Sequence, residues 1–147
     1  MSLRYLLDTN TVVFFLKGHP AVVERWAQVP PAEMAISAIV WHELMVGATA
    51  SQAPEARLAG LRRLGEVLEV LPFTREDAAA SATIHAELQA IGTPIGPRDT
   101  LIAGTARRHA TIVVTNKSRE FLRVGGLTVA DWTLTAQPAN QKKKKRP

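Results

Sequence analysis

The sequence predicts an α/β fold in which a central, mostly parallel sheet is flanked by helices. Short apolar runs rich in β-branched residues alternate with longer helical segments, and this alternation is typical of parallel strands joined by helical crossovers. The chain has 147 residues, of which 46% are hydrophobic, so one domain can bury a substantial core. Because active sites in such folds gather at the carboxyl ends of the strands, polar residues that follow a strand are the first candidates for function.

The first half of the chain alternates strand and helix signals. Residues 4–7 are an expected strand that ends at Asp8, and residues 10–16 are an expected helix that Gly18 and Pro20 terminate. Further expected elements are a helix over 21–28, a strand over 33–37, a helix over 39–50 and a helix over 55–68. The last helix repeats leucines at helical spacing with charged residues between them, which indicates one face against the core.

The second half continues the alternation. An expected short strand over 69–72 precedes a long alanine-rich helix over 75–91, which the segment 92–94, Gly-Thr-Pro, terminates. The remaining expected elements are a helix over 97–109, a strand over 111–115 and an edge strand over 127–130. We expect residues 1–134 to form one domain and residues 135–147 to form a basic, disordered tail.

The net charge of the chain is concentrated at its end. Lys plus Arg number 18 against 13 Asp plus Glu, a formal charge of +5, but five of the bases form the run Lys142–Arg146. Without that run the basic and acidic side chains balance, so the total charge does not mark the folded body as a nucleic-acid clamp. The run itself either adds salt-sensitive phosphate contacts or serves only as a solubilising extension.

The absence of cysteine excludes several chemistries. Thiol nucleophiles, disulfides, iron–sulfur clusters and thiolate zinc sites all require a residue that this chain lacks. The apolar run near the N-terminus is too short for a signal peptide, and no stretch approaches the ~18 uninterrupted apolar residues of a membrane span. We therefore expect a soluble, cytoplasmic protein.

Three acids occupy positions that favour a functional interpretation. Asp8 follows the first expected strand, although an aspartate there also caps the helix that begins next. Glu43 lies toward the apolar side of its helix, where an acid is rare without a partner, although a boundary position facing solvent or an arginine also explains it. Asp99 lies in the first turn of its helix, where the helix dipole favours an acid in any case.

The three acids predict a metal site if they converge in one cleft of a parallel sheet. Clustered carboxylates repel one another, and a divalent cation is the usual remedy. Hard oxygen ligands select Mg²⁺, for which Mn²⁺ can substitute, and both ions commonly bridge to substrate phosphates.

Four segments carry a resemblance to a known family. They are Leu6-Leu-Asp-Thr-Asn10, Ile36-Ser-Ala-Ile-Val-Trp-His-Glu-Leu44, Gly96-Pro-Arg-Asp-Thr-Leu-Ile-Ala103, and Val113-Val-Thr-Asn116 continued by Arg119-Glu-Phe121. In this order they resemble PIN-domain ribonucleases, most closely the VapC toxins of bacterial toxin–antitoxin pairs. The similarity covers roughly residues 3–132, and four motifs in the right order are far more specific than any one alone.

The resemblance implies a fold, an activity and partners. The expected fold is a PIN-like three-layer sandwich, and the expected activity is that of a Mg²⁺- or Mn²⁺-dependent endoribonuclease toxin. Relatives of this kind form homodimers and are inhibited by a tightly bound cognate antitoxin of the VapB type. Their RNA substrate is often a transfer RNA that is cut in its anticodon loop.

The resemblance also assigns roles to residues. Asp8, Glu43 and Asp99 match the family's three firm acids, and metal-assisted hydrolysis of a phosphodiester suits them. We expect Asp8 and Asp99 to bind the metal directly, and Glu43 to complete the site by orienting or deprotonating a water. Residues expected to orient these acids or the substrate, although capping and turn bonds explain them as well, are Thr9, Asn10, Thr115 and Asn116.

The fourth acid departs from the family's pattern. Many relatives place an acid immediately after the fourth strand, but here Asn116 is followed by Lys117, and the next acid is Glu120. If residues 117–122 form a helical turn, Glu120 can point back to the site as a catalytic acid. Otherwise Glu120 pairs with a neighbouring arginine, and Lys117 supplies a positive charge that can hold an RNA phosphate.

Two other functions compete with the nuclease hypothesis. An aspartyl-phosphate phosphatase also has an aspartate after its first strand, but it needs a second aspartate two residues later, where this chain has Asn10. A non-catalytic RNA- or partner-binding module is the other alternative. It is suggested by Lys117, which departs from the family's pattern of acids. The intact set of Asp8, Glu43 and Asp99 favours the nuclease.

Overall fold

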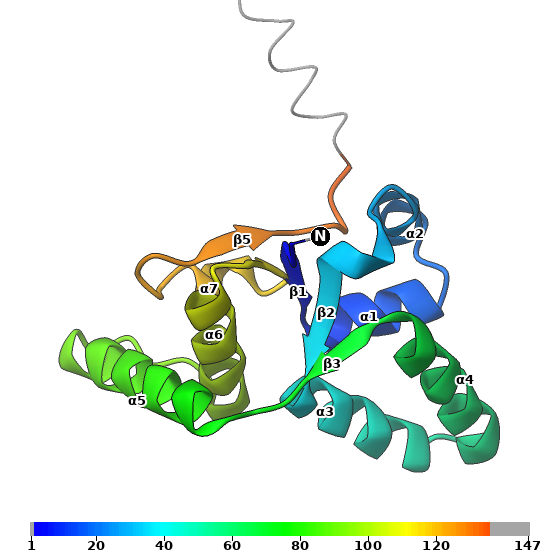
Figure 1. The fold of residues 1–147 in the computed structure, drawn as a ribbon, viewed down its shortest axis with the longest axis horizontal. Helices are drawn as coiled ribbons and strands as arrows, with labels where there is room; N and C mark the ends of the chain where they lie inside the picture. Colours follow the sequence, from blue (N-terminus) through cyan, green and yellow to red (C-terminus); the bar gives the residue numbers. More distant parts are fainter. Residues whose placement is uncertain (1, 136–147) are drawn as a thin grey trace, which may run out of the picture.

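The computed structural model describes residues 2–135, within which a five-stranded sheet forms the centre of the molecule (Figure 1). The strand order is β3-β2-β1-β4-β5, and every neighbouring pair is parallel. The strands are β1 (Tyr5–Leu7), β2 (Met34–Ser37), β3 (Glu69–Leu71), β4 (Ile112–Val114) and β5 (Thr128–Ala130). The predicted α/β class is confirmed, and the sheet is parallel throughout.

The helices form two layers, one on each side of this sheet. They are α1 (Thr9–Leu16), α2 (Pro20–Ala27), η1 (Pro31–Glu33), α3 (Ala38–Thr49), α4 (Pro54–Val67), α5 (Arg75–Ala90), α6 (Pro97–His109) and α7 (Ser118–Phe121). The chain steps from β1 to β2 to β3 in one direction and then returns across the sheet to β4. Because such crossovers are right-handed, this reversal puts α5 and α6 on the side opposite α1, α2 and α4, as Figure 1 shows.

The expected elements are all present, with small shifts at their ends. Pro31–Glu33 forms a short 3₁₀ turn, so the second strand starts one residue later than predicted. Thr111 and Thr115 lie just outside β4, and their hydroxyls bond to a helix carbonyl and to a carboxylate instead. Residues 117–122 contain the helical turn α7. The predicted basic tail lies outside the described residues from position 136 onward.

The central strand carries the first candidate acid to the edge of the sheet. In β1, Leu6 and Leu7 are fully buried between β2 and β4, and each such side chain contributes roughly 1.5–3 kcal/mol of burial free energy. Leu7 pairs with Val114, and the next residue, Asp8, donates its backbone N–H to the carbonyl of Val114 at 2.9 Å. The ends of β1 and β4 are therefore held side by side.

Helices α5 and α6 pack unusually closely. An ideal Cβ built on Gly104 in α6 would lie 2.7 Å from the backbone nitrogen of Ser81 in α5. Nearby, the fully buried Asp77 accepts a 2.8 Å hydrogen bond from Nε of Arg108 and also caps α5 together with Thr74. These contacts fix the position of α6, which carries Asp99 in its first turn.

Among residues 2–135, no helix combines the length and the apolar character needed to cross a membrane.

We expect Gly104→Ala to lower the free energy of unfolding by about 1–3 kcal/mol, because the added methyl group forces α5 and α6 apart. Urea denaturation followed by circular dichroism measures this change. Gly47→Ala in α3 is the matched control, since a Cβ there meets no atom within 4 Å. It should stabilise the protein by about 0.5–1 kcal/mol through helix propensity alone. Equal effects of the two substitutions would contradict the close-packing argument.

Candidate active site

Asp8 is a fully buried carboxylate at the carboxyl end of β1. Its Oδ1 accepts the backbone N–H of Thr9 at 2.8 Å, so Asp8 is the N-cap of α1. Its Oδ2 accepts the hydroxyl of Thr115 at 2.7 Å from the end of β4. The capping interpretation of Asp8 is therefore correct, and the same residue also reaches the edge of the sheet where a parallel fold places its chemistry.

The environment of Asp8 disfavours its charged form. Burial raises the pKa of the Asp8 carboxyl, and the opposing influences of the Thr115 hydrogen bond, the Lys117 charge and the Thr9 amide do not fully offset it. The charge of Asp99 pushes the pKa further upward. A cation placed beside such an acid stabilises its charged form.

Lys117 supplies a cation between Asp8 and Asp99. Its Nζ lies 2.8 Å from Oδ1 and 3.0 Å from Oδ2 of Asp99, and 3.7 Å from Oδ2 of Asp8. Burial lowers the pKa of this ammonium, but the hydrogen bond with Asp99 and the charges of Asp8, Asp99 and Glu43 outweigh it, so the pKa is raised. Lys117 is therefore held in its charged form by the acids around it.

The backbone of Lys117 is anchored separately from its side chain. Its N–H donates to Oγ1 of Thr115 at 2.9 Å, and that same hydroxyl donates to Asp8. Thr115 thus connects the start of α7 to the end of β1. A positioning role for Thr115 stays a prediction, which its hydrogen bond to Asp8 supports.

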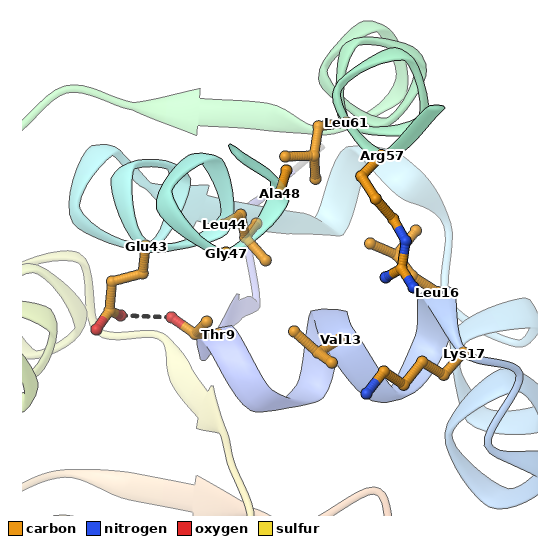
Figure 2. A pocket seen from close by; sticks show the side chains of 10 residues that line it. All are labelled: Thr9, Val13, Leu16, Lys17, Glu43, Leu44, Gly47, Ala48, Arg57 and Leu61. Carbon is orange, nitrogen blue, oxygen red and sulfur yellow. Dashed lines mark hydrogen bonds between the residues drawn. The ribbon is translucent and has the colours of Figure 1, made fainter. Parts of the chain in front are cut away.

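Glu43 projects from α3 toward the start of α1 (Figure 2). Its Oε1 accepts the hydroxyl of Thr9 at 2.5 Å, and its Oε2 lies 3.4 Å from Nη1 of Arg98. Its carboxylate is half-buried and faces an arginine, as the structural alternative for Glu43 expected, and its functional role stays a prediction. Arg98 adjoins Asp99 in α6, so Glu43 and Asp99 lie on neighbouring helices that contact each other.

The other expected site residues occupy different positions relative to the acids. Nδ2 of Asn10 donates to Oδ1 of Asn116 at 3.1 Å, which ties the first turn of α1 to the segment after β4. Glu120 lies in α7, half-buried, and within residues 2–135 its side chain makes no hydrogen bond or ion pair with Asp8, Glu43 or Asp99. The alternative ion pair of Glu120 with a neighbouring arginine is also not formed in this range.

The side chains brought together are hard oxygen donors with a cation already among them. Within the described residues, no three acids or histidines close around a single metal position. The Lys117 ammonium nevertheless lies where a cation neutralises Asp8 and Asp99, and Glu43 contributes to its electrostatic environment. A divalent cation therefore fits the chemistry of this donor set.

Two features of the site escaped the sequence-based reasoning. The direct contact of Lys117 with Asp99 joins two segments 18 residues apart, and the position of Lys117 shortly after the fourth strand was the only signal. An arginine partner for Glu43 was one of the expected alternatives, but nothing in the sequence identified it as Arg98, which lies 55 residues away.

An apolar pocket of about 220 Å³ lies between α1, α3 and α4, with Glu43 among its lining residues (Figure 2). Thr9 and Glu43 lie at one end of the pocket, and Lys17 and Arg57 lie at the other. Its lining is otherwise made by the small and aliphatic residues Val13, Leu16, Leu44, Gly47, Ala48 and Leu61.

The fold and the acids define a class of protein. Residues 5–127 match the model of the PIN domain, which is most of the chain, so the chain belongs to the PIN-domain family.

Within that family, the chain is similar to VapC proteins. It is 41% identical over 131 residues to the tRNA(fMet)-specific endonuclease VapC of Shigella flexneri, covering 89% of this chain and 99% of the relative. The VapC2 ribonuclease of Haemophilus influenzae strain Rd is 37% identical over 131 residues, covering 88% and 98%. A chain in the crystal structure of DNA-bound VapBC from Salmonella typhimurium superposes with a TM-score of 0.83 at 42% identity, covering 88% of this chain and 98% of that chain. The predicted resemblance is confirmed.

Replacing Asp8 by asparagine should raise the thermal unfolding temperature at neutral pH in the presence of a chelator. The pKa of Asp8 is raised in the folded state, so its ionised form costs stability. That cost is absent below the ordinary pKa of about 4 and grows as the pH rises through the folded-state value. The advantage of Asp8→Asn should therefore shrink as the pH falls toward about 4.

Asp77→Asn is a control of opposite sign for this experiment. Burial raises the pKa of Asp77, but its hydrogen bonds with Arg108 and Thr74 outweigh burial and lower it. The stability that Asp77 contributes is present above its ordinary pKa and is lost in acid, so Asp77→Asn should lower the unfolding temperature at neutral pH. A lower unfolding temperature for Asp8→Asn at neutral pH would contradict the prediction that the ionised Asp8 carboxylate destabilises the folded protein.

Proposed function

We propose that this protein is a metal-dependent endoribonuclease toxin that hydrolyses RNA phosphodiester bonds and is neutralised by a cognate antitoxin. The observation that carries the proposal is the buried carboxylate of Asp8, which faces Asp99 across one ammonium group at the carboxyl edge of a parallel sheet. Burying an acid costs stability, so a neutral side chain would fill any purely structural role at this position better. Its purpose is therefore chemical.

The residues that would hold Mg²⁺, or Mn²⁺ in its place, are Asp8, Asp99 and Glu43. The chemistry that such a cation supplies is polarisation of the scissile phosphate and a lower pKa for the attacking water. Thr115 keeps the Asp8 carboxylate oriented through a 2.7 Å hydrogen bond, and Thr9 does the same for Glu43. These two hydrogen bonds hold the Asp8 and Glu43 carboxylates in place before substrate binds.

Glu43 is suited to accept the proton of the attacking water. Its carboxylate is half-buried, and its contacts with Thr9 and Arg98 hold one oxygen each. Arg98 is mostly exposed, so it can turn from Glu43 toward an RNA phosphate without breaking the core. Asn10 and Asn116, joined by their side-chain amides, would position the RNA strand at the edge of the site.

The substrate we propose is a transfer RNA cut in its anticodon loop. This choice is supported by the 41% identity with two VapC proteins, of Shigella flexneri and Salmonella typhimurium, that are named as tRNA(fMet)-specific endonucleases. Sequence-specific RNA recognition generally targets single-stranded loops, whose bases can be splayed out. An anticodon loop meets that requirement.

The partners we propose are a VapB-like antitoxin and a second copy of this chain in a homodimer. Solved relatives that cover most of this chain were crystallised as VapBC complexes from Salmonella typhimurium and Rickettsia felis. The apolar pocket beside Glu43 supports an inhibitor that reaches the acids from α1, α3 and α4.

Purified antitoxin-free protein should cut total transfer RNA into discrete fragments in the presence of Mg²⁺ or Mn²⁺. We expect Asp8→Asn, Asp99→Asn and Glu43→Gln each to lower the cleavage rate by roughly a hundredfold or more. A chelator should abolish cleavage by the unchanged protein, and end-mapping of the fragments gives the cut site. Binding of RNA without turnover, unaffected by Asp8→Asn, would favour a non-catalytic binding module instead.

Glu120 is proposed as a fourth acid that acts through its neighbours. It lies in α7, three residues after Lys117, and makes no contact with Asp8 or Asp99 among the hydrogen bonds and ion pairs of residues 2–135. We expect Glu120→Gln to reduce cleavage by about tenfold, less than the loss of a direct ligand. Arg119→Gln on the same turn is the control, and identical rates for the two variants would remove Glu120 from the site.

A further inference from the structure

The ammonium group of Lys117 lies between two acids of the site. Its Nζ lies 2.8 and 3.0 Å from the two oxygens of Asp99 and 3.7 Å from Oδ2 of Asp8. One ammonium thus contacts both acids that are proposed to bind the metal directly. Other basic side chains near the site, such as Arg98, contact one acid only.

The oxygens facing Lys117 have few other partners. Oδ1 of Asp8 accepts the Thr9 amide, and Oδ2 of Asp8 accepts the Thr115 hydroxyl. For Asp99, the Lys117 ammonium is the side-chain partner found among residues 2–135. The ammonium is therefore a compensating charge that Asp8 and Asp99 share, in addition to the hydrogen bonds that Thr115 and Thr9 give to Asp8.

We propose that Lys117 is a tethered cation that competes with the divalent metal ion for Asp8 and Asp99, and thereby weakens metal binding and stabilises the metal-free site. This inference rests on the proposed metal-dependent function. It differs from a role for Lys117 in holding RNA phosphate, because it concerns the protein before RNA binds.

Competition follows from the size of the space and from charge. Mg²⁺ binds carboxylate oxygens at about 2.0–2.1 Å, so a metal shared by Asp8 and Asp99 needs the volume that Nζ occupies between them. Two cations that close to each other also repel strongly in a partly buried site. The ammonium must therefore leave before the two acids can share a metal.

Lys117 is able to leave without disturbing the fold. Its side chain is 35% exposed, so a path to solvent is open. Its backbone stays anchored through the 2.9 Å hydrogen bond from its N–H to Thr115, which does not depend on the side chain. A substitution at this position should accordingly preserve the start of α7 and the orientation of Asp8.

The test is calorimetric titration of the full chain with Mn²⁺, without RNA, at one pH and one ionic strength. We expect Lys117→Met to bind Mn²⁺ at least about tenfold more tightly than the unchanged protein, because a unit charge is removed beside the ion. Lys117→Arg keeps the charge and should leave the affinity close to that of the unchanged protein. Arg119→Met removes a positive charge from the exposed side of the same turn and should change the affinity by less than about twofold.

Thermal unfolding gives a second readout that reports whether the variants fold. Metal-free Lys117→Met should unfold at a lower temperature than the unchanged protein, because Asp8 and Asp99 then repel without the ammonium between them. Saturating Mn²⁺ should raise its unfolding temperature by more than it raises that of the unchanged protein.

Distinct results separate failure of this inference from failure of the proposed function. If the unchanged protein binds Mn²⁺, Asp8→Asn abolishes binding and Lys117→Met binds equally or more weakly, the competition is wrong and the metal site stands. If Lys117→Met weakens only RNA binding, Lys117 holds phosphate and the competition is again wrong. If neither the unchanged protein nor Lys117→Met binds Mn²⁺, the inference and the metal-dependent function both fail.

Discussion

The burial of one carboxylate, that of Asp8, is the constraint on which the rest of the site depends. A charge at the end of a central strand has lost its water, so protein groups must supply the compensation. Three groups do so: the first amide of α1, the hydroxyl that ends β4 and the ammonium that begins α7. The parallel sheet delivers all three to one place because β1 and β4 are neighbours whose carboxyl ends coincide.

Each polar contact near Asp8 holds the fold and the site at the same time. The Thr115 hydroxyl accepts the Lys117 amide and donates to Asp8, so the geometry of a turn and the orientation of an acid share one oxygen atom. The Thr9 residue likewise gives its amide to Asp8 and its hydroxyl to Glu43. The structural and functional interpretations of such residues are therefore compatible, because capping and orientation are the same contact viewed from two partners.

Much of the fold was predictable because local periodicity and turn residues mark its elements, and Asp8 and Asp99 were predictable because strand ends and helix starts converge in a parallel sheet. The partners of these acids were not predictable in the same way. The pairing of Lys117 with Asp99 depends on how α6 approaches the end of β4, which close packing against α5 controls. Glu43 illustrates the same limit. Its position was expected, but the contacts of its two carboxylate oxygens with Thr9 and Arg98 depend on tertiary packing.

The bond between Thr115 and Asp8 joins residues 107 positions apart. During synthesis the N-terminal acid therefore emerges from the ribosome long before the segment that orients it and neutralises its charge. Contacts of such high sequence separation form late, after the intervening helices have become available to pack. The nascent chain consequently carries an incomplete acid cluster until residue 117 has left the exit tunnel, so the order of translation itself delays assembly of the site.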